Sequence, residues 1–377
     1  MILSRREGKN VKIDRRLFAN FDWILLGLVL LISGIGILNL YSSGYTMCAG
    51  RESLYIKQIS WLLLGLVMMI IAFSVDYHII IRYAYFIYAV SVLLLLLVFF
   101  YGNITHGSQR WLLLWGFSFQ PSELMKLAIV IVLARFFNDN MERGYRFGNV
   151  ATLFVILGVP FFLIVKQPDL GTALFLAILA FCMLAFVGVG RKFLIGFISS
   201  GIVFTPLFWF FLKDYQRGRI LTFLNPERDP LGAGYHIIQS IIAIGSGGIW
   251  GKGILKGTQT HLRFLPEQQT DFAFSVFAEE WGFIGVFVLM FIFLALILWG
   301  LKIVRNSKDF PGALIAFGIT MLIFWGIFIN IGMVIGIFPV VGIPLPFLSY
   351  GGSSMIVLMI GAGLLMNVSM RRFILQY

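Results

Sequence analysis

Charged residues are scarce in this chain of 377 residues. Asp, Glu, Lys and Arg together make up 12% of it, against about 25% in typical soluble domains. This scarcity excludes an ordinary soluble globular protein, and the hydrophobic share of 59% indicates a chain that folds in lipid. Linker-like stretches are also lacking, so we expect one integral membrane domain over residues 1–377. No cleavable signal peptide is expected, because residues 1–16 are polar and basic and the first apolar run is too long.

Cysteine and histidine are scarce as well, with two and four residues respectively. Cys48 and Cys182 lie too far apart in the expected topology to form a disulfide framework or a metal knuckle. The four histidines show no helical pairing of the HExxH kind. A zinc site is therefore not expected.

Apolar runs long enough to cross a bilayer make up most of the chain. Such runs form helices, because lipid offers no partner for the hydrogen bonds of an open backbone. We predict ten spans, at residues 21–42, 55–75, 79–101, 121–137, 150–166, 170–189, 193–212, 278–301, 311–336 and 351–369. The predicted fold is an all-α polytopic membrane protein with ten transmembrane helices and a long extracytoplasmic loop, 213–277, between helices 7 and 8.

Lysine and arginine predict the orientation of these spans. With the N-terminus in the cytoplasm, seventeen of them fall in inside segments and four in short outside loops, which obeys the positive-inside rule. Both termini are then cytoplasmic. The net charge of +12 is explained by basic residues that attract anionic lipid headgroups, so no nucleic-acid partner is expected. The loop 213–277 is also basic, but long translocated segments escape the rule; we expect short helices there, on the outer face.

Polar residues at membrane depth are the functional candidates, because lipid penalises them. The fourth span opens with Pro121, Glu123 and Lys126; Pro121 suits a first helical turn, and the two charged residues share one helix face. One interpretation is an ion pair that lets a charged helix end tolerate the interface, and the other is a site at the outer mouth. Arg110 and Trp111 lie just upstream, and Trp111 is also typical of the aromatic belt.

Two more polar clusters fall on the same outer side. The turn after the fifth span contains Lys166 and Asp169, and it is either a plain polar turn or part of the site. The segment 264–272 ends the long loop and contains Thr270 and Asp271. Asp271 is either an exposed helix-cap residue or a carboxylate with a raised pKa near the apolar bundle, able to serve as a general base.

Glycine and proline mark two further outside segments. The glycines at 245–257 fit neither a Walker motif nor a dinucleotide fingerprint, but Lys252 among exposed backbone amides could meet a pyrophosphate. The segment 338–354 contains three prolines and cannot be regular helix throughout. Non-helical backbone at membrane depth is tolerated only where it is buried in protein or lines a cavity.

Four ordered motifs give the chain a family resemblance. They are Gln120–Glu123, Gln167–Gly171, Leu265–Glu267 followed by Thr270–Phe272, and Pro344–Phe347 followed by Ser349–Ser354. With them the chain resembles the SEDS family (shape, elongation, division and sporulation) from its first span to its last. Residues 14–16 with 20–23, and residues 278–280 after Asp271, resemble its elongation branch more than its division branch. The chain departs from the family pattern at Gln269, because a histidine is expected directly before Thr270.

The resemblance implies a peptidoglycan glycosyltransferase. Its substrate would be lipid II, whose sugars are joined with inversion and with release of polyprenyl pyrophosphate; this needs a base and positive charge for the leaving group. By motif match Asp271 is the base. The further candidate substrate contacts are Arg110, Trp111, Glu123, Lys126, Asp169, Lys252 and Glu279. A divalent cation, Mg²⁺ or Mn²⁺, could share the cationic role through oxygen ligands; the sequence does not show one.

The resemblance also implies a place and a partner. The place is the bacterial cytoplasmic membrane, and the partner is a class B penicillin-binding protein with one span, which would cross-link the new glycan. Two other functions stay open. A lipid II flippase would need access from both faces, whereas a purely structural membrane subunit would leave the acidic residues at membrane depth without a role.

Overall fold

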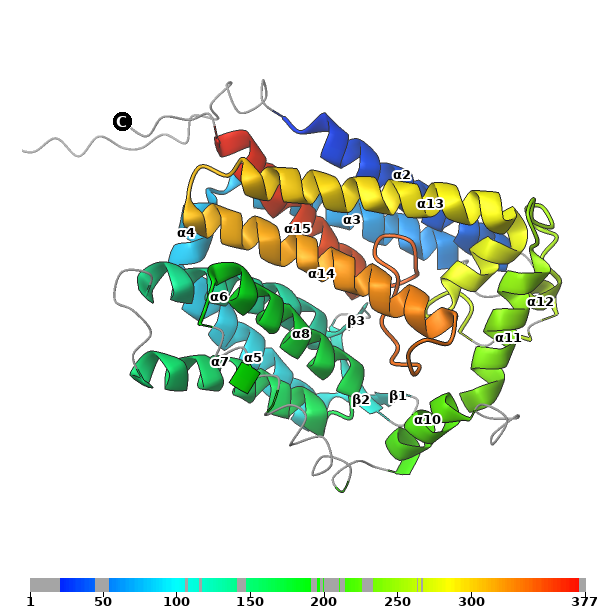
Figure 1. Cartoon of the computed structure of the whole chain (residues 1–377), viewed down its shortest axis with the longest axis horizontal. Helices are drawn as coiled ribbons and strands as arrows, with labels where there is room; N and C mark the ends of the chain where they lie inside the picture. Colours follow the sequence, from blue (N-terminus) through cyan, green and yellow to red (C-terminus); the bar gives the residue numbers. More distant parts are fainter. Residues whose placement is uncertain are drawn as a thin grey trace, which may run out of the picture.

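Long helices lying side by side form most of the molecule (Figure 1). The computed structural model describes residues 21–44, 54–105, 108–114, 117–140, 147–190, 195–196, 199, 210, 214–225, 233–262, 264–265 and 267–372. The long helices are α2 (Trp23–Gly44), α3 (Leu54–Ser74), α5 (Ala84–Tyr101), α6 (Pro121–Asn140), α7 (Phe147–Lys166), α8 (Leu170–Val187), α13 (Ala273–Arg305), α14 (Phe310–Val334) and α15 (Gly352–Arg371).

Seven of the described helices are long and apolar enough to cross a membrane: α2, α3, α5, α8, α13, α14 and α15. Two more predicted spans correspond to helices that differ from these seven. α6 carries four charged residues over its length, and α7 is apolar only over Ala151–Lys166. The predicted span 193–212 lies almost wholly outside the described residues. The predicted span 79–101 is divided, because a short helix, α4 (Tyr77–Arg82), precedes α5.

The short helices of the predicted long loop gather at one end of the long helices, on the right in Figure 1. Within 213–277 the described residues form α10 (Asp214–Leu224), α11 (Ala233–Ser246) and α12 (Thr258–His261). An irregular loop follows α14 at the same end, where the three prolines were predicted to prevent regular helix. This end holds every candidate functional residue named above.

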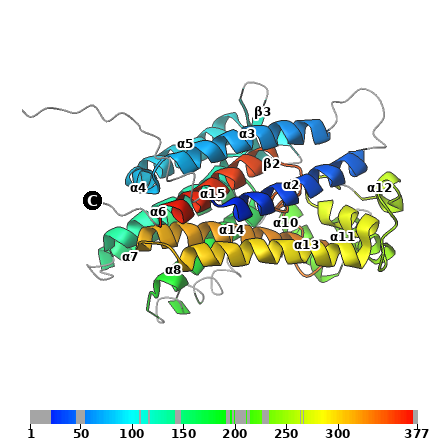
Figure 2. The ribbon, with the colours of Figure 1, turned by 90° about the horizontal axis from the view of Figure 1, so that it is seen from above.

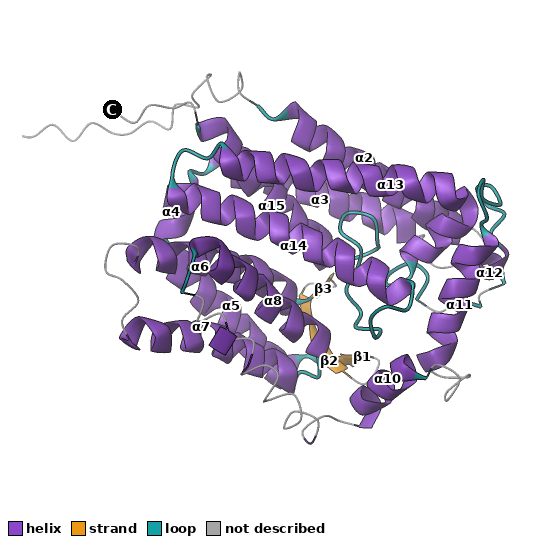
Figure 3. Ribbon diagram, in the orientation of Figure 1, coloured by secondary structure: helices purple, strands orange, loops and turns teal. Residues whose placement is uncertain are grey.

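A small β-sheet joins α5 to α6, and the sequence analysis did not predict it. Strands β1 (Asn103–Thr105), β2 (Ser108–Leu114) and β3 (Phe117–Phe119) pair antiparallel in the order β1-β2-β3. Figure 3 shows them in orange, at the end of the bundle where α10 (Asp214–Leu224) lies. Leu113 pairs with Ser118 in this sheet. Antiparallel pairing between the strands satisfies backbone N–H and C=O groups of this segment without a helix. The expectation of a purely α-helical fold is corrected to this extent.

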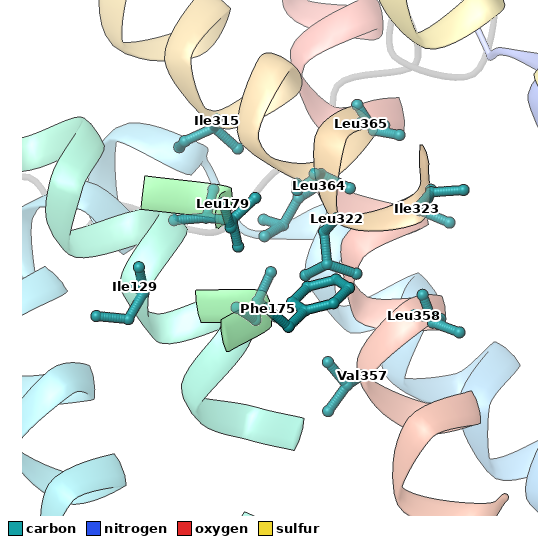
Figure 4. Packing of buried hydrophobic residues seen from close by; sticks show 14 of the residues in the cluster. Ile129, Phe175, Leu179, Ile315, Leu322, Ile323, Val357, Leu358, Leu364 and Leu365 are labelled. Atoms are coloured by element: carbon teal, nitrogen blue, oxygen red, sulfur yellow. The ribbon is translucent and has the colours of Figure 1, made fainter. Parts of the chain in front are cut away.

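The centre of the bundle is α15. Of its apolar stretch 83% is buried, against 22% for α3, α5 and α13, so those three helices lie at the edge with one face outward. Figure 2 shows α15 between α3 on one side and α14 on the other. Side chains from α6, α8, α14 and α15 meet in a tight apolar core, with Phe175 and Leu322 at its middle (Figure 4).

Asp22, the only charge of the first span, is held in a polar network. Its carboxylate accepts hydrogen bonds from the Leu25 backbone N–H (3.1 Å), the Trp299 indole (2.9 Å) and the Ser369 hydroxyl (2.9 Å). A buried carboxylate is tolerated when such donors replace its water. Asp22 therefore connects the start of α2 to the last turns of α13 and of α15.

Candidate active site

Asp271 lies in a turn that leads into α13. Within this turn the backbone N–H groups of Thr270 and Phe272 donate to the Glu267 carbonyl, at 3.2 and 3.3 Å. The N-cap of α13 is Phe272, which makes no side-chain capping bond. Asp271 stands one residue before the cap, so the helix-cap interpretation does not account for its carboxylate.

The surroundings of Asp271 give its carboxyl an unusual pKa. Phe272, Phe274 and Leu265 are almost fully buried around the turn, and Asp271 itself is only partly exposed. Burial raises the pKa of Asp271 to about 6; the Glu267 carboxylate raises it as well, and Arg219 and Arg110 lower it. A carboxylate with this pKa is ionised at neutral pH and still basic enough to accept a proton in a reaction.

Near Asp271, Arg110 of β2 lies close to Asp169 at the start of α8. The Arg110 Nη1 atom lies 3.7 Å from Asp169 Oδ1, and its Nη2 atom donates to the Pro168 carbonyl. Asp169 is also the N-cap of α8, accepting hydrogen bonds from the Thr172 backbone N–H (3.2 Å) and hydroxyl (2.9 Å). Asp169 is thus fixed by the helix end, and it orients Arg110.

The loop after α14 approaches Asp271 with a glycine. Gly342 has a φ of +72°, and a Cβ built on it would lie 3.4 Å from Asp271 Oδ2. This close approach in the left-handed region suits a residue without a side chain. The neighbouring Val340 carbonyl accepts a hydrogen bond from Arg219 of α10 at 3.3 Å. The non-helical segment therefore borders the carboxylate, and it is largely buried in protein, one of the two expected settings; that it also lines a cavity stays a prediction.

Three residues near Asp271 were missed by the sequence analysis. Arg219 was one basic residue among several in the long loop, and nothing in the sequence distinguished it. Gly342 lay unmarked inside the proline-rich segment. Asn330 could have been found, because it is a polar residue within the apolar run of α14, and lipid penalises such residues. It is fully buried and donates to the Asp271 carbonyl at 3.0 Å.

Glu123 and Lys126 form a buried ion pair on the first turns of α6. Glu123 Oε1 and Lys126 Nζ are 2.6 Å apart, and the two residues are only 5% and 4% exposed. Lys126 also lies over the Phe175 ring of α8, 4.8 Å from its centroid. The pair therefore faces the protein interior and not lipid, as expected; that it lines a polar cavity stays a prediction.

Glu279 and Lys252 contact each other at a second place, further along α13. Glu279 is fully buried, and its Oε1 atom accepts from Lys252 Nζ (2.7 Å), the Gln259 backbone N–H (3.0 Å) and the Thr258 hydroxyl (3.2 Å). These contacts hold the glycine-rich segment against α13. Eight residues separate Asp271 from Glu279, about 12 Å along a helix. Substrate binding by Glu279 and Lys252 stays a prediction beside this structural role.

The glycine-rich segment packs backbone to backbone on a kink in α13. At the kink Gly282 has a φ of +65° and a ψ of −166°. The Lys252 and Gly253 backbone N–H groups donate to the carbonyls of Glu279 and Glu280, both at 3.0 Å. A Cβ on Gly251 would lie 2.1 Å from the Glu280 oxygen. The glycines are therefore explained by close approach to a helix, and no phosphate loop is needed to account for them.

Trp111 and a possible divalent cation were the remaining candidates from the sequence analysis. Trp111 is partly buried on β2, next to Arg110. Among the described residues no group of three or more His, Cys, Asp or Glu side chains is arranged to hold a metal ion. The acidic side chains that act on the pKa of Asp271 are Glu267 and Asp169. A divalent cation here would need further oxygen ligands, which a pyrophosphate could supply.

Comparison with known proteins identifies the family to which the chain belongs. The model of the cell cycle protein family FtsW/RodA/SpoVE matches residues 16–373. The peptidoglycan glycosyltransferase MrdB of Escherichia coli K12 is 44% identical over 78% of this chain and 80% of its own length. The peptidoglycan glycosyltransferase RodA of Treponema pallidum is 34% identical over 94% of this chain and 98% of its own length.

Solved structures show the same fold. A chain of a peptidoglycan synthase complex, studied for the coordination of polymerisation and crosslinking, is 31% identical and superimposes with a TM-score of 0.79. The rod-shape-determining protein RodA of Thermus thermophilus is 27% identical, with a TM-score of 0.69. Each comparison covers 94% of this chain and 98% of the other. The chain is therefore a polytopic, mostly helical membrane protein, and it belongs to the FtsW/RodA/SpoVE family, the SEDS proteins, where it is RodA-like.

Proposed function

We propose that this chain is a peptidoglycan glycosyltransferase that polymerises lipid II into glycan strands during cell elongation, with Asp271 as its general base. The relatives that carry the name peptidoglycan glycosyltransferase support the activity. The observation that supports the site is the carboxylate of Asp271, whose pKa of about 6 suits a base working near neutral pH. Arg110 and Arg219 supply positive charge nearby.

The chemistry follows from these groups. Asp271 takes the proton from the 4-hydroxyl of the acceptor sugar while that oxygen attacks the anomeric carbon of the donor. The bond from the anomeric carbon to the pyrophosphate oxygen breaks, the configuration inverts, and polyprenyl pyrophosphate leaves with its negative charge. Arginine suits this charge, because a guanidinium binds phosphate oxygens with two parallel hydrogen bonds. A divalent cation, Mg²⁺ or Mn²⁺, would add to this stabilisation.

The distribution of polar groups favours the transferase over a lipid II flippase. A flippase needs access from both faces, but the candidate groups lie at one end of the bundle. At the other end Asp76, His78, Asp309 and Arg371 tie α4, α14 and α15 together: His78 lies 2.8 Å from Asp76 and 2.7 Å from Asp309, and Arg371 lies 3.0 Å from Asp76. This network links the helix ends where a flippase would open.

The topology and the partner belong to the same proposal. Ten spans with both termini in the cytoplasm place Asp271 on the outer side, where flipped lipid II arrives. The match to a chain of a peptidoglycan synthase complex supports a class B penicillin-binding protein as the partner that cross-links the product. The acidic residues at membrane depth then have a role, which a purely structural subunit would not give them.

The decisive experiment is polymerisation of labelled lipid II by purified protein, with and without the partner, read on a gel. Asp271→Asn should lower polymer formation by about 10²–10⁴-fold, because asparagine keeps the size but accepts no proton. Asp309→Asn is the matched control: Asp309 caps α14 through Gly312 at 2.9 Å, asparagine caps equally well, and the residue lies at the opposite end. Near-normal polymer from well-folded Asp271→Asn would refute the assignment and favour the flippase.

A further inference from the structure

Three buried asparagines use their side-chain amides to hold backbone carbonyls of other segments. Asn39 of α2 donates to the Ala273 carbonyl at 2.8 Å, Asn330 of α14 donates to the Asp271 carbonyl, and Asn367 of α15 donates to the Ala72 carbonyl at 2.9 Å. All three are 3% exposed or less. Only Asn330 holds the proposed catalytic residue itself.

Asn330 bridges two segments that meet at the site. Its Nδ2 atom donates to the Asp271 carbonyl at 3.0 Å and to the Ile343 carbonyl at 2.8 Å. An amide nitrogen carries two hydrogens, so both are used. The Asn330 Oδ1 atom has no hydrogen-bond partner among the described residues. The opposite orientation of the amide would aim this oxygen at two carbonyl oxygens, so only one orientation satisfies the two carbonyls.

The second segment, through Gly342, borders the Asp271 carboxylate directly. Gly342 directly precedes Ile343. A Cβ built on Gly342 would lie 3.4 Å from Asp271 Oδ2. The same loop is held at two further points. The Val340 carbonyl accepts a hydrogen bond from Arg219. The Val341 carbonyl lies so close to Gly171 of α8 that a Cβ on Gly171 would be 2.6 Å from the Val341 oxygen. Asn330 thus joins the backbone of the base to a loop that is already fixed.

We propose that Asn330 is a positioning residue for the reaction: its amide locks the turn of Asp271 against the Gly342 loop and so sets where the carboxylate stands. The inference rests on the proposed role of Asp271 as base. The charged groups that face this carboxylate are Glu267 from its own turn, Arg219 from α10, Arg110 from β2 and Asp169 from the start of α8. Releasing the turn changes the distances to all four.

The test compares Asn330→Ala with Asn367→Ala. Both changes remove a fully buried amide that holds backbone carbonyls, but Asn367 lies at the cytoplasmic end of α15. Each variant is purified with the wild type and assayed for lipid II polymerisation per folded molecule across pH 5–8. We expect Asn330→Ala to lose up to about 100-fold in kcat, the order of loss that a misplacement of about 1 Å can cause. KM should change much less, and the acid limb of the pH profile should move.

The outcomes separate positioning from a merely structural bond. Loss of folded protein lowers the yield but leaves the rate per folded molecule and the limb of the pH profile unchanged, and Asn367→Ala should show only that. Equal rates and equal limbs for the two variants would overturn the proposal. If Asn330→Ala is not recovered folded, Asn330→Ser keeps one hydroxyl donor, and Gly342→Ala strains the loop beside the carboxylate, because Gly342 has a positive φ. Unchanged profiles in both variants would overturn the proposal equally. Failure of Asp271→Asn to lose activity would instead remove the base assignment itself.

Discussion

Removing one member of the Glu123–Lys126 pair tests whether this buried pair is part of the site or only part of the fold. Each partner is nearly inaccessible to solvent, so a single substitution leaves a buried charge without its counterion. Such a change typically costs about 3–5 kcal/mol, a large part of the ~5–15 kcal/mol that stabilises a protein. Replacing both partners by neutral residues of similar size costs little or nothing.

The position of the pair predicts which single change is worse. Glu123 lies in the first turn of α6, where the helix dipole favours a negative charge by about 0.3–1 kcal/mol. Lys126→Met therefore leaves a carboxylate that the helix end partly compensates. Glu123→Gln leaves an ammonium group near the positive helix end, and only the contact with the Phe175 ring offsets this. Glu123→Gln should be the less stable variant, by about 1 kcal/mol.

The assay is a double-mutant cycle in detergent, with thermal unfolding and lipid II polymerisation measured on the same preparations. Arg135→Met is the control on the same helix, because the Arg135–Asp139 pair is as short, 2.6 Å, but about one third exposed; it should cost less than about 1 kcal/mol. We expect the double variant to regain stability and to remain inactive. Single variants as stable as Arg135→Met would refute the burial argument, and an active double variant would make the pair purely structural.

Three further predictions follow from single residues. Asp271→Asn should be more stable than the wild type above pH 6, by up to about 3 kcal/mol. Folding raises the Asp271 pKa to about 6 from an ordinary value of about 3.9, so at a pH above both values the charge on Asp271 destabilises the folded state. At pH 3 the wild type and Asp271→Asn should have the same free energy of unfolding. A difference in stability that persists at pH 3 would contradict the reasoning. Gly251→Ala should destabilise the protein markedly, because its Cβ would meet a backbone oxygen at 2.1 Å, whereas Gly245→Ala, with nothing within 4 Å, should not; thermal unfolding of the pair decides. A single cysteine at Trp250, whose side chain is 81% exposed, should react with an impermeant thiol reagent added outside cells; reaction from the cytoplasmic side only would overturn the topology.

Burial limits the accessibility of Gln216 in the predicted long loop. Gln216 lies in the same predicted loop and its sequence surroundings are polar, so it looks accessible. In the fold it is only 7% exposed, because α10 turns this face toward protein. A polar residue in a predicted loop is therefore no assurance of access to solvent.

The sequence by itself determined the membrane class and most of the helices, and it predicted that the polar clusters share one side of the bundle. Lipid cannot hydrogen-bond a backbone, so an apolar run of sufficient length has one stable solution, the helix. The same penalty singled out Glu123, Lys126 and Asp271 as polar residues at or near membrane depth. These inferences are local, because each depends on a single stretch of chain and on the solvent around it.

Only the tertiary structure decided which groups stand around Asp271 and which serve the fold. Arg219 and Asn330 lie on helices far from Asp271 in the chain, and no local pattern encodes a hydrogen bond between such segments. Lys252 and Glu279 are the converse case, because two charges that suit a substrate are already paired with each other at 2.7 Å. Packing decides these matters, since a buried polar group must find its partner wherever the fold brings one within reach.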